Sequence, residues 1–227
     1  GAFLPCGENH HDRKSCRQNL LENKISPEEA RKSFGLEPDK KTILIIGGSL
    51  GARTMNESVL AHLNDIRQSD VQVIWQTGKY YSLQIADDLA KVEPVTNMKV
   101  MDFISSMDNA YAAADIVVSR AGASSISELC LLGKPCILVP SPNVAEDHQT
   151  KNALALSTKD AAIFVADKDA KDQLIGIALE NVKDDARLAS LSVNVKKLAF
   201  DNSANMIAEE VVKLANEYRN KKNQMKR

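Results

Sequence analysis

Residues 115–135 read DIVVSRAGASSISELCLLGKP, and the order of residue types in this stretch decides the fold class. A run of strand-forming residues ends at Ser119, Gly122 permits a turn, and a helical spacing follows over residues 125–132. We expect the helix to begin near Ser124, which leaves its first backbone N–H groups without intrahelical partners. A strand that leads through a glycine turn into a helix is the building unit of a parallel α/β sheet.

The same unit recurs along the chain. Short β-rich runs lie at residues 42–46, 71–75, 98–101, 115–119, 136–140 and 161–165. Helical spacing occurs between them, for example over residues 53–66 and 80–90. The runs are apolar with little alternation, which is typical of strands covered on both faces. The sequence therefore predicts a doubly wound, Rossmann-like α/β domain, with its ligand site beyond the carboxyl ends of the parallel strands.

The composition is that of an ordinary globular protein, with 44% hydrophobic and 26% charged residues in 227, enough for one large domain or two small ones. The net charge of -1 favours neither nucleic acid nor an anionic membrane, so we expect no nucleic-acid partner. No apolar run approaches the ~18 residues of a membrane-spanning helix, and no signal peptide opens the chain. Cys130 and Cys136 lie in apolar surroundings and no CxxC pair occurs, which favours a reduced, cytoplasmic location.

The two ends of the chain differ from its middle. Residues 1–16 lack periodicity and are expected to be a disordered or artificial leader; their two cysteines and two histidines fit no zinc spacing, so no metal site is predicted. Residues 17–41 are expected to form a helix capped by Ser26 and a linker. Residues 42–203 then form the ligand-binding domain. Residues 204–227 form an amphipathic helix and a basic tail, which is either a solvated terminus or a contact with anionic lipid.

A glycine-rich loop, GGSLGARTMN, begins at residue 47, directly after the first predicted strand. Gly48 allows the backbone to approach a ligand closely, Ser49 offers a hydroxyl, and a helix is expected to begin near Ala52. The dinucleotide fingerprint G-x-G-x-x-G fails because Ser49 stands at its second glycine. The loop is therefore either a phosphate site or a turn whose glycines serve packing alone.

The turn after residue 119 favours a ligand more strongly. Its uncapped helix start attracts an anion, and Glu128 lies one turn beyond Ser124 on the same face, where its carboxylate can accept hydrogen bonds from a ribose diol. An anion site beside a diol site indicates a nucleotide sugar. The alternative makes Ser124 and Ser125 helix N-caps and Glu128 a first-turn acid whose charge is stabilised by the helix dipole.

A third polar segment, PSPNVAEDHQTKNALAL, begins at residue 140 and follows another predicted strand. His148, Gln149 and Asn152 lie at a predicted helix start and suit the hydroxyl groups of a sugar. The alternative is a surface helix for which Asp147 supplies the cap.

Three motifs in this order, GGSLGART.N, SRAG..S.SEL...GKP.ILVP and DHQTKNA, resemble the carboxyl-terminal half of the MurG family of bacterial glycosyltransferases. The resemblance runs from about residue 17 to about residue 218. It implies the second domain of the two-domain GT-B fold and a hexosyltransferase that uses UDP-N-acetylglucosamine without a metal or other cofactor. The family transfers N-acetylglucosamine to lipid I with inversion, giving lipid II for peptidoglycan synthesis.

The resemblance also implies roles for individual residues. Ser49 and the helix start at residues 123–125 would contact the diphosphate, Glu128 the ribose, and the backbone of Ile104 the uracil. Gln149 and Asn152 would contact the sugar. Arg17 matches a family arginine, although the Lys14-Ser15-Cys16 before it departs from the family pattern. The complete predicted donor-binding set is Arg17, Gly48, Ser49, Ile104, Gly122, Ala123, Ser124, Ser125, Ile126, Ser127, Glu128, His148, Gln149 and Asn152.

No residue of the chain resembles the family's acceptor side, so no catalytic residue is assigned. We expect a donor-binding half that meets lipid I and the cytoplasmic face of the membrane through an amino-terminal domain. The alternative is a non-catalytic UDP-sugar-binding module, or the donor subunit of a split transferase. A dehydrogenase is disfavoured because the glycine fingerprint fails and no acid follows the second predicted strand.

Overall fold

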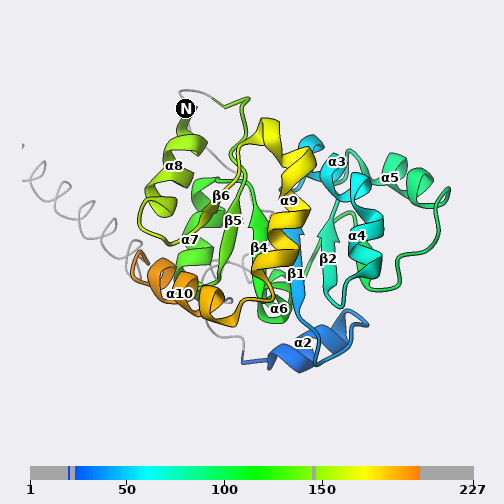
Figure 1. Ribbon diagram of the computed structural model, residues 1–227, viewed down its shortest axis with the longest axis horizontal. Coiled ribbons are helices and arrows are strands. Elements are labelled where there is room, and N and C mark those ends of the chain that lie inside the picture. Colours follow the sequence, from blue (N-terminus) through cyan, green and yellow to red (C-terminus); the bar gives the residue numbers. More distant parts are fainter. Residues whose placement is uncertain (1–19, 21–23, 145–146, 200–227) are drawn as a thin grey trace, which may run out of the picture.

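The computed structural model describes residue 20, residues 24–144 and residues 147–199 (Figure 1). Within these residues a single sheet of six parallel strands has the order β3-β2-β1-β4-β5-β6. The strands are β1 (Thr42–Ile46), β2 (Gln72–Gln76), β3 (Met98–Met101), β4 (Ile116–Ser119), β5 (Cys136–Leu138) and β6 (Ile163–Phe164). This order reverses between β1 and β4, which confirms the predicted doubly wound fold.

Each strand lies where the sequence predicts one, but the last two strands are shorter than predicted. The predicted strands at residues 136–140 and 161–165 reduce to three and two residues. All residues of β1, β2, β4 and β5 are buried, whereas edge strand β3 is half-exposed. The uniformly apolar runs are thus explained by burial of both sheet faces.

Helices cover both faces of the sheet (Figure 1). They are α2 (Pro27–Ser33), α3 (Arg53–Ala61), α4 (Leu63–Gln68), α5 (Ser82–Leu89), α6 (Met107–Ala113), α7 (Ala123–Leu132), α8 (His148–Ser157), α9 (Asp167–Asn181) and α10 (Asp185–Lys196). Ile43 and Ile45 of β1 pack with residues of α3, α4, α5 and α9. Leu44 and Ile46 point to the other face and pack with residues of α2, α6, α7 and α8. Because successive side chains of β1 point to opposite faces of the sheet, this strand contributes to two hydrophobic cores, one on each face.

The expected continuous helix over residues 53–66 is wrong, because it is broken at His62. The ring Nδ1 of His62 lies 2.9 Å from the carbonyl oxygen of Ser58, which is the acceptor that its own backbone N–H would use in an unbroken helix. That N–H donates instead to Val59. Side-chain competition for one carbonyl accounts for the interruption.

A buried polar group joins α3 to β2. The indole N–H of the fully buried Trp75 donates to Asn56 Oδ1 at 3.0 Å, and Asn56 Nδ2 donates to the carbonyl oxygen of Thr77 at 2.9 Å. Both polar ends of the Asn56 amide are thus satisfied, as burial requires. The start of α3 is fixed to the loop that follows β2.

Ser26 caps α2 in a reciprocal capping box with Glu29, as predicted. Cys130 and Cys136 are buried and unpaired, and burial raises the pKa of Cys136 to about 12. Among the described residues no helix is long and apolar enough to cross a membrane, and no group of three potential metal ligands occurs. Arg17, the leader at residues 1–16 and the predicted helix and tail at residues 204–227 lie outside the described residues.

Candidate nucleotide-sugar site at the carboxyl edge of the sheet

The sheet brings the predicted site residues to one edge. Strands β1 and β4 are neighbours, with Ile46 paired to Ser119, so the loops that follow them lie side by side where the strand order reverses. The predicted residues within the described part of the chain come from the segments after β1, β3, β4 and β5. All four segments leave the sheet at its carboxyl edge.

The conformation of the glycine loop after β1 is set in part by packing. Gly48 and Gly51 have φ values of 88° and 90°, in the left-handed region that favours glycine. A Cβ on Gly51 would lie 2.2 Å from the Thr77 carbonyl oxygen, and one on Gly78 would lie 2.1 Å from Gly51 N. The packing explanation therefore holds for Gly51, whereas a Cβ on Gly48 would meet no atom within 4 Å.

Gln76, at the end of β2, connects two predicted site residues. Its buried side chain donates from Nε2 to the Gly48 carbonyl oxygen at 3.0 Å and accepts at Oε1 from the Ile104 backbone N–H at 3.1 Å. The sequence analysis missed this residue. A polar residue directly after the apolar run of residues 73–75, at the carboxyl end of the strand, was the available signal.

The start of α7 is open. Gly122 is its N-cap, no side chain caps it, and Ser124 and Ser125 lie inside the helix, so the alternative that made them N-caps is wrong. The helix begins one residue earlier than expected because the extended backbone of Gly122 precedes it. A Cβ on Gly122 would meet nothing within 4 Å. First-turn N–H groups and open space together suit an anion.

Glu128 is held by a tyrosine from another helix. The hydroxyl of Tyr111, on α6, donates to Glu128 Oε2 at 3.0 Å. Tyr111 is only 2% exposed, and its burial together with the charge of Glu128 raises its pKa, which keeps it a neutral donor. Glu128 is the sixth residue of α7, so its reading as a first-turn acid is wrong. Its carboxylate is oriented by Tyr111, which the sequence analysis did not identify.

A polar cavity of ≈ 710 Å³ opens between the loops after β1, β4 and β5. Gly48 and Gln149 of the predicted set line it, together with Arg53 and Arg120. Arg120 donates to Asp167 Oδ1 at 2.5 Å and to the Val139 and Pro140 carbonyl oxygens. The positive charge of Arg120 is therefore compensated within the fold, and its unpredicted role is to join β4 to the end of β5 and to α9.

The predicted residues of α8 are partly used by the fold. Gln149 Oε1 accepts from the Ser141 backbone N–H at 2.9 Å, and Asn152 Nδ2 donates to the Ala121 carbonyl oxygen at 3.2 Å. His148 is exposed at the first position of the helix. Asp147 is the N-cap residue of α8, but its side chain accepts no backbone N–H of the helix and instead accepts from the Thr150 hydroxyl at 2.6 Å.

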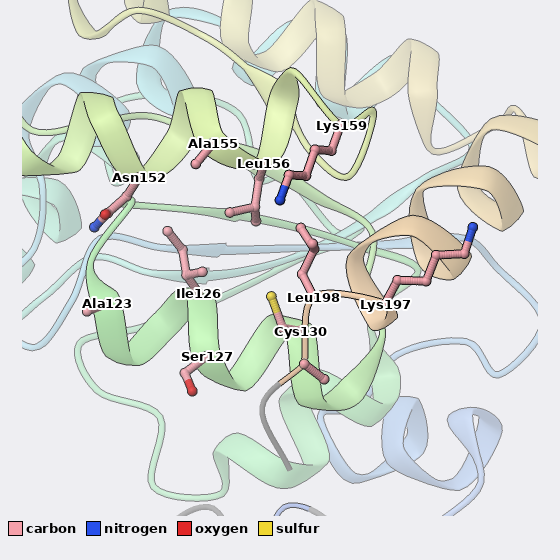
Figure 2. A pocket seen from close by; sticks show the side chains of 11 residues that line it. Ala123, Ile126, Ser127, Cys130, Asn152, Ala155, Leu156, Lys159, Lys197 and Leu198 are labelled. Atoms are coloured by element: carbon pink, nitrogen blue, oxygen red, sulfur yellow. The ribbon is translucent and has the colours of Figure 1, made fainter. Parts of the chain in front are cut away.

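A second cavity, of ≈ 480 Å³, lies between α7 and α8. Figure 2 shows Ala123 and Asn152 at one end and Leu198 at the other, with Ile126 between them. Ser127 also lines this cavity, whose walls are mostly apolar. The structure thus divides the predicted set: Gly48 and Gln149 face the polar cavity, whereas Ala123, Ile126, Ser127 and Asn152 line the apolar one. The other described members line neither of these two cavities; they are Ser49, Ile104, Gly122, Ser124, Ser125, Glu128 and His148.

The fold and this edge define a class of protein: doubly wound α/β domains, whose ligand sites lie beyond the carboxyl ends of the strands where the strand order reverses. A model of the glycosyltransferase family 28 C-terminal domain matches residues 42–211, and the chain belongs to this family.

Named relatives agree with this assignment. The chain is 58% identical over 203 residues to the UDP-N-acetylglucosamine--N-acetylmuramyl-(pentapeptide) pyrophosphoryl-undecaprenol N-acetylglucosamine transferase of Phocaeicola vulgatus, covering 89% of this chain and 54% of the relative. The Bacteroides fragilis enzyme of the same name is 55% identical over 214 residues, covering 94% of this chain and 56% of its own length. The chain thus spans about half the length of these relatives.

Among solved structures, Acinetobacter baumannii MurG matches with a TM-score of 0.70 and 26% identity, over 86% of this chain and 55% of that protein. The resemblance to the carboxyl-terminal half of MurG is confirmed. A Staphylococcus aureus MnaA–UDP structure shares only the fold, with a TM-score of 0.61 and 12% identity, over 82% of this chain and 48% of that protein.

Proposed function

We propose that the chain binds UDP-N-acetylglucosamine and is the donor half of an inverting transferase that converts lipid I to lipid II. The observation that carries this proposal is the open start of α7 beside a carboxylate that Tyr111 orients. The printed names of the relatives support the identity of the sugar and of its acceptor. The donor-binding unit would comprise residues 42–203.

The proposed roles follow the positions of the residues. The diphosphate would lie at the start of α7 and at Ser49. The Glu128 carboxylate would accept hydrogen bonds from the two ribose hydroxyl groups. The uracil would lie at the Ile104 backbone, beside Gln76. The sugar would extend toward Gln149 and the polar cavity. As the acceptor hydroxyl oxygen bonds to the anomeric carbon and the bond from that carbon to the diphosphate breaks, the N–H groups of α7 would stabilise the charge that develops on the leaving UDP.

The acceptor side is proposed to lie in a separate amino-terminal half. The proton of the acceptor hydroxyl must pass to a general base, and we assign none to this chain. Lipid I is membrane-bound, so the complete enzyme would work at the cytoplasmic face of the membrane.

Calorimetry with UDP, UDP-N-acetylglucosamine, ADP and NAD tests the proposal. We expect binding of both uridine compounds and none of ADP or NAD. The reason is that backbone groups near Ile104 have fixed positions and would match the hydrogen-bonding edge of uracil but not that of adenine. ADP binding as tight as UDP binding would overturn the proposal.

A radiolabelled transfer assay separates the donor half from a complete enzyme. The chain alone should transfer no N-acetylglucosamine to lipid I above background, because ordering both reactants contributes ~7–11 kcal/mol and this chain orders only the donor. Joining it to the amino-terminal half of the Phocaeicola vulgatus relative should restore turnover. Donor binding without restored turnover would favour a non-catalytic binding module.

A further inference from the structure

Two buried glutamines lie at opposite ends of β2 and use their side chains differently. Gln72 begins the strand, and its amide bonds twice to one residue: Nε2 donates to the Glu37 carbonyl oxygen at 2.8 Å, and Oε1 accepts from the Glu37 backbone N–H at 2.7 Å. Gln76 ends the strand, and its amide bonds to two different loops, at Gly48 and at Ile104. Gln72 is 2% exposed and Gln76 5%, so each amide depends on its protein partners.

Gln76 lies where the backbone ladder of the sheet ends. It pairs with Ile46 of β1 on one side and with Met101 of β3 on the other, and these are the last pairs of the two ladders. Strands β1 and β3 are not neighbours, because β2 lies between them. The loops after β1 and β3 therefore leave the sheet with no ladder between them, and the Gln76 side chain bridges the two.

The two hydrogen bonds of Gln76 fix the direction of two peptide units. The C=O and N–H of a trans peptide point to opposite sides. Since the Gly48 carbonyl points to Gln76, the Ser49 N–H points away from it. Since the Ile104 N–H points to Gln76, the Phe103 carbonyl points away from it. One buried side chain thus sets a backbone donor, which suits a phosphate, and a backbone acceptor, which suits the N–H of uracil.

We propose that Gln76 is a positioning residue that couples recognition of the base to binding of the diphosphate, an inference that rests on the proposed function. UDP is one ligand with two ends, and it gains affinity from both ends only where both subsites can be occupied at once. The distance and relative orientation of the two loops must then match the nucleotide. The Gln76 amide maintains that match from a buried position between the loops.

Comparing whole and divided ligands tests this coupling. Gln76→Met keeps the length of the side chain but removes both hydrogen bonds. UDP affinity is measured by calorimetry, and the weaker affinities for uridine and inorganic pyrophosphate by NMR titration. We expect the variant to bind each fragment less than about twofold more weakly, because each loop can still meet its own fragment, and to bind UDP about tenfold more weakly, because the loops no longer hold both ends together.

Gln72→Met is the matched control, since it also removes two buried hydrogen bonds from β2 but lies at the end of the strand away from the site. Both variants should lose stability in urea denaturation, whereas only Gln76→Met should lose UDP affinity. Equal UDP affinity in the two variants would make Gln76 a purely structural residue and overturn the proposal. A loss of uridine affinity as large as the loss of UDP affinity would assign Gln76 to the base alone, which also overturns it.

Gln76→Glu provides a rescue that depends on pH. A protonated carboxyl can accept from the Ile104 N–H and donate to the Gly48 carbonyl, as the amide does, whereas the ionised form has no donor and repels that carbonyl. Burial raises the pKa of a carboxyl, so the UDP affinity of this variant, relative to the unchanged chain, should rise as the pH falls from about 8 to about 5.5. A ratio that does not change with pH contradicts the coupling.

The proposed function and this inference fail in different ways. If the chain is not a UDP-sugar-binding domain, the unchanged chain shows no binding of UDP in the calorimetry. If only the coupling is wrong, the unchanged chain binds UDP and the difference between Gln76→Met and Gln72→Met disappears.

Discussion

The loops after β1 and β4 both lead into a helix that no side chain caps, yet they use glycine in opposite ways. Gly51, in the first loop, has a left-handed backbone and is enclosed by Thr77, Gly78 and Tyr81. Gly122, in the second, has an ordinary φ of −72° and open space where its side chain would be. The fold requires the first glycine, whereas the second leaves room that the fold itself does not use.

Gly51→Ala should have the largest effect. The new Cβ would lie 2.2 Å from a backbone oxygen at a φ of 90°, so overpacking and a left-handed non-glycine residue together should cost about 3 kcal/mol of unfolding free energy or more. Urea denaturation measures this loss. Gly122→Ala is the matched control, and equal losses in the two variants would refute the distinction between the loops.

Glu128→Gln should have the second-largest effect, on the affinity for UDP. If the Glu128 carboxylate accepts hydrogen bonds from the ribose hydroxyl groups, the variant should bind UDP about 1.5–3 kcal/mol more weakly, which is the range for hydrogen bonds to a charged group. Calorimetry checks this value. Tyr111→Phe keeps the charge but removes its orienting donor, so it should weaken UDP less. Unchanged UDP affinity in Glu128→Gln with a lowered melting temperature would make Glu128 a purely structural residue.

Gly122→Ala should separate binding from stability. Since its Cβ would meet no protein atom, the unfolding free energy should fall only by the preference for glycine over alanine at an N-cap, about 1 kcal/mol or less. The methyl group would enter the space assigned to the diphosphate, so UDP affinity should fall about tenfold, or ~1.4 kcal/mol. Parallel urea and calorimetric titrations measure the two changes separately. Full UDP affinity would place the diphosphate elsewhere.

Ser49→Ala should have the smallest effect. Loss of one neutral hydroxyl donor to the diphosphate should weaken UDP by about 0.5–1.5 kcal/mol. Phosphate-free uridine, measured by the same method, should bind both forms equally. A larger loss than that of Glu128→Gln would reverse the order of importance of the two loops.

The strands were predictable because a sheet buried on both faces needs apolar runs, and residues 43–46 and 116–118 supply them. Their carboxyl ends then located the site at one edge. The break at His62 was not predictable from periodicity, because a side chain competing for one carbonyl does not change the apolar spacing. Helices α9 and α10 were not identified at all; helix α9 carries Asp167, the partner of Arg120.

Within the site, sequence motifs identified Glu128 but not Tyr111, 17 residues away. The same holds for Arg120 and Asp167, separated by 47 residues. Such partners are chosen by how α6, α7 and α9 pack on the sheet, and no local pattern records that packing. The sequence thus indicated candidate ligand groups such as Glu128, and the structure supplied the partner, Tyr111, that orients its carboxylate.

The bond between Trp75 and Asn56 gives the protein an internal optical reporter. Trp75 is the only tryptophan in the chain, so all indole fluorescence comes from one buried ring. Asn56 connects that ring to the carbonyl of Thr77, the same oxygen that Gly51 approaches. Rearrangement of the glycine loop therefore changes the hydrogen bonding of the fluorophore. Emission at equilibrium and after rapid mixing with UDP can therefore test the proposed donor site without an added dye.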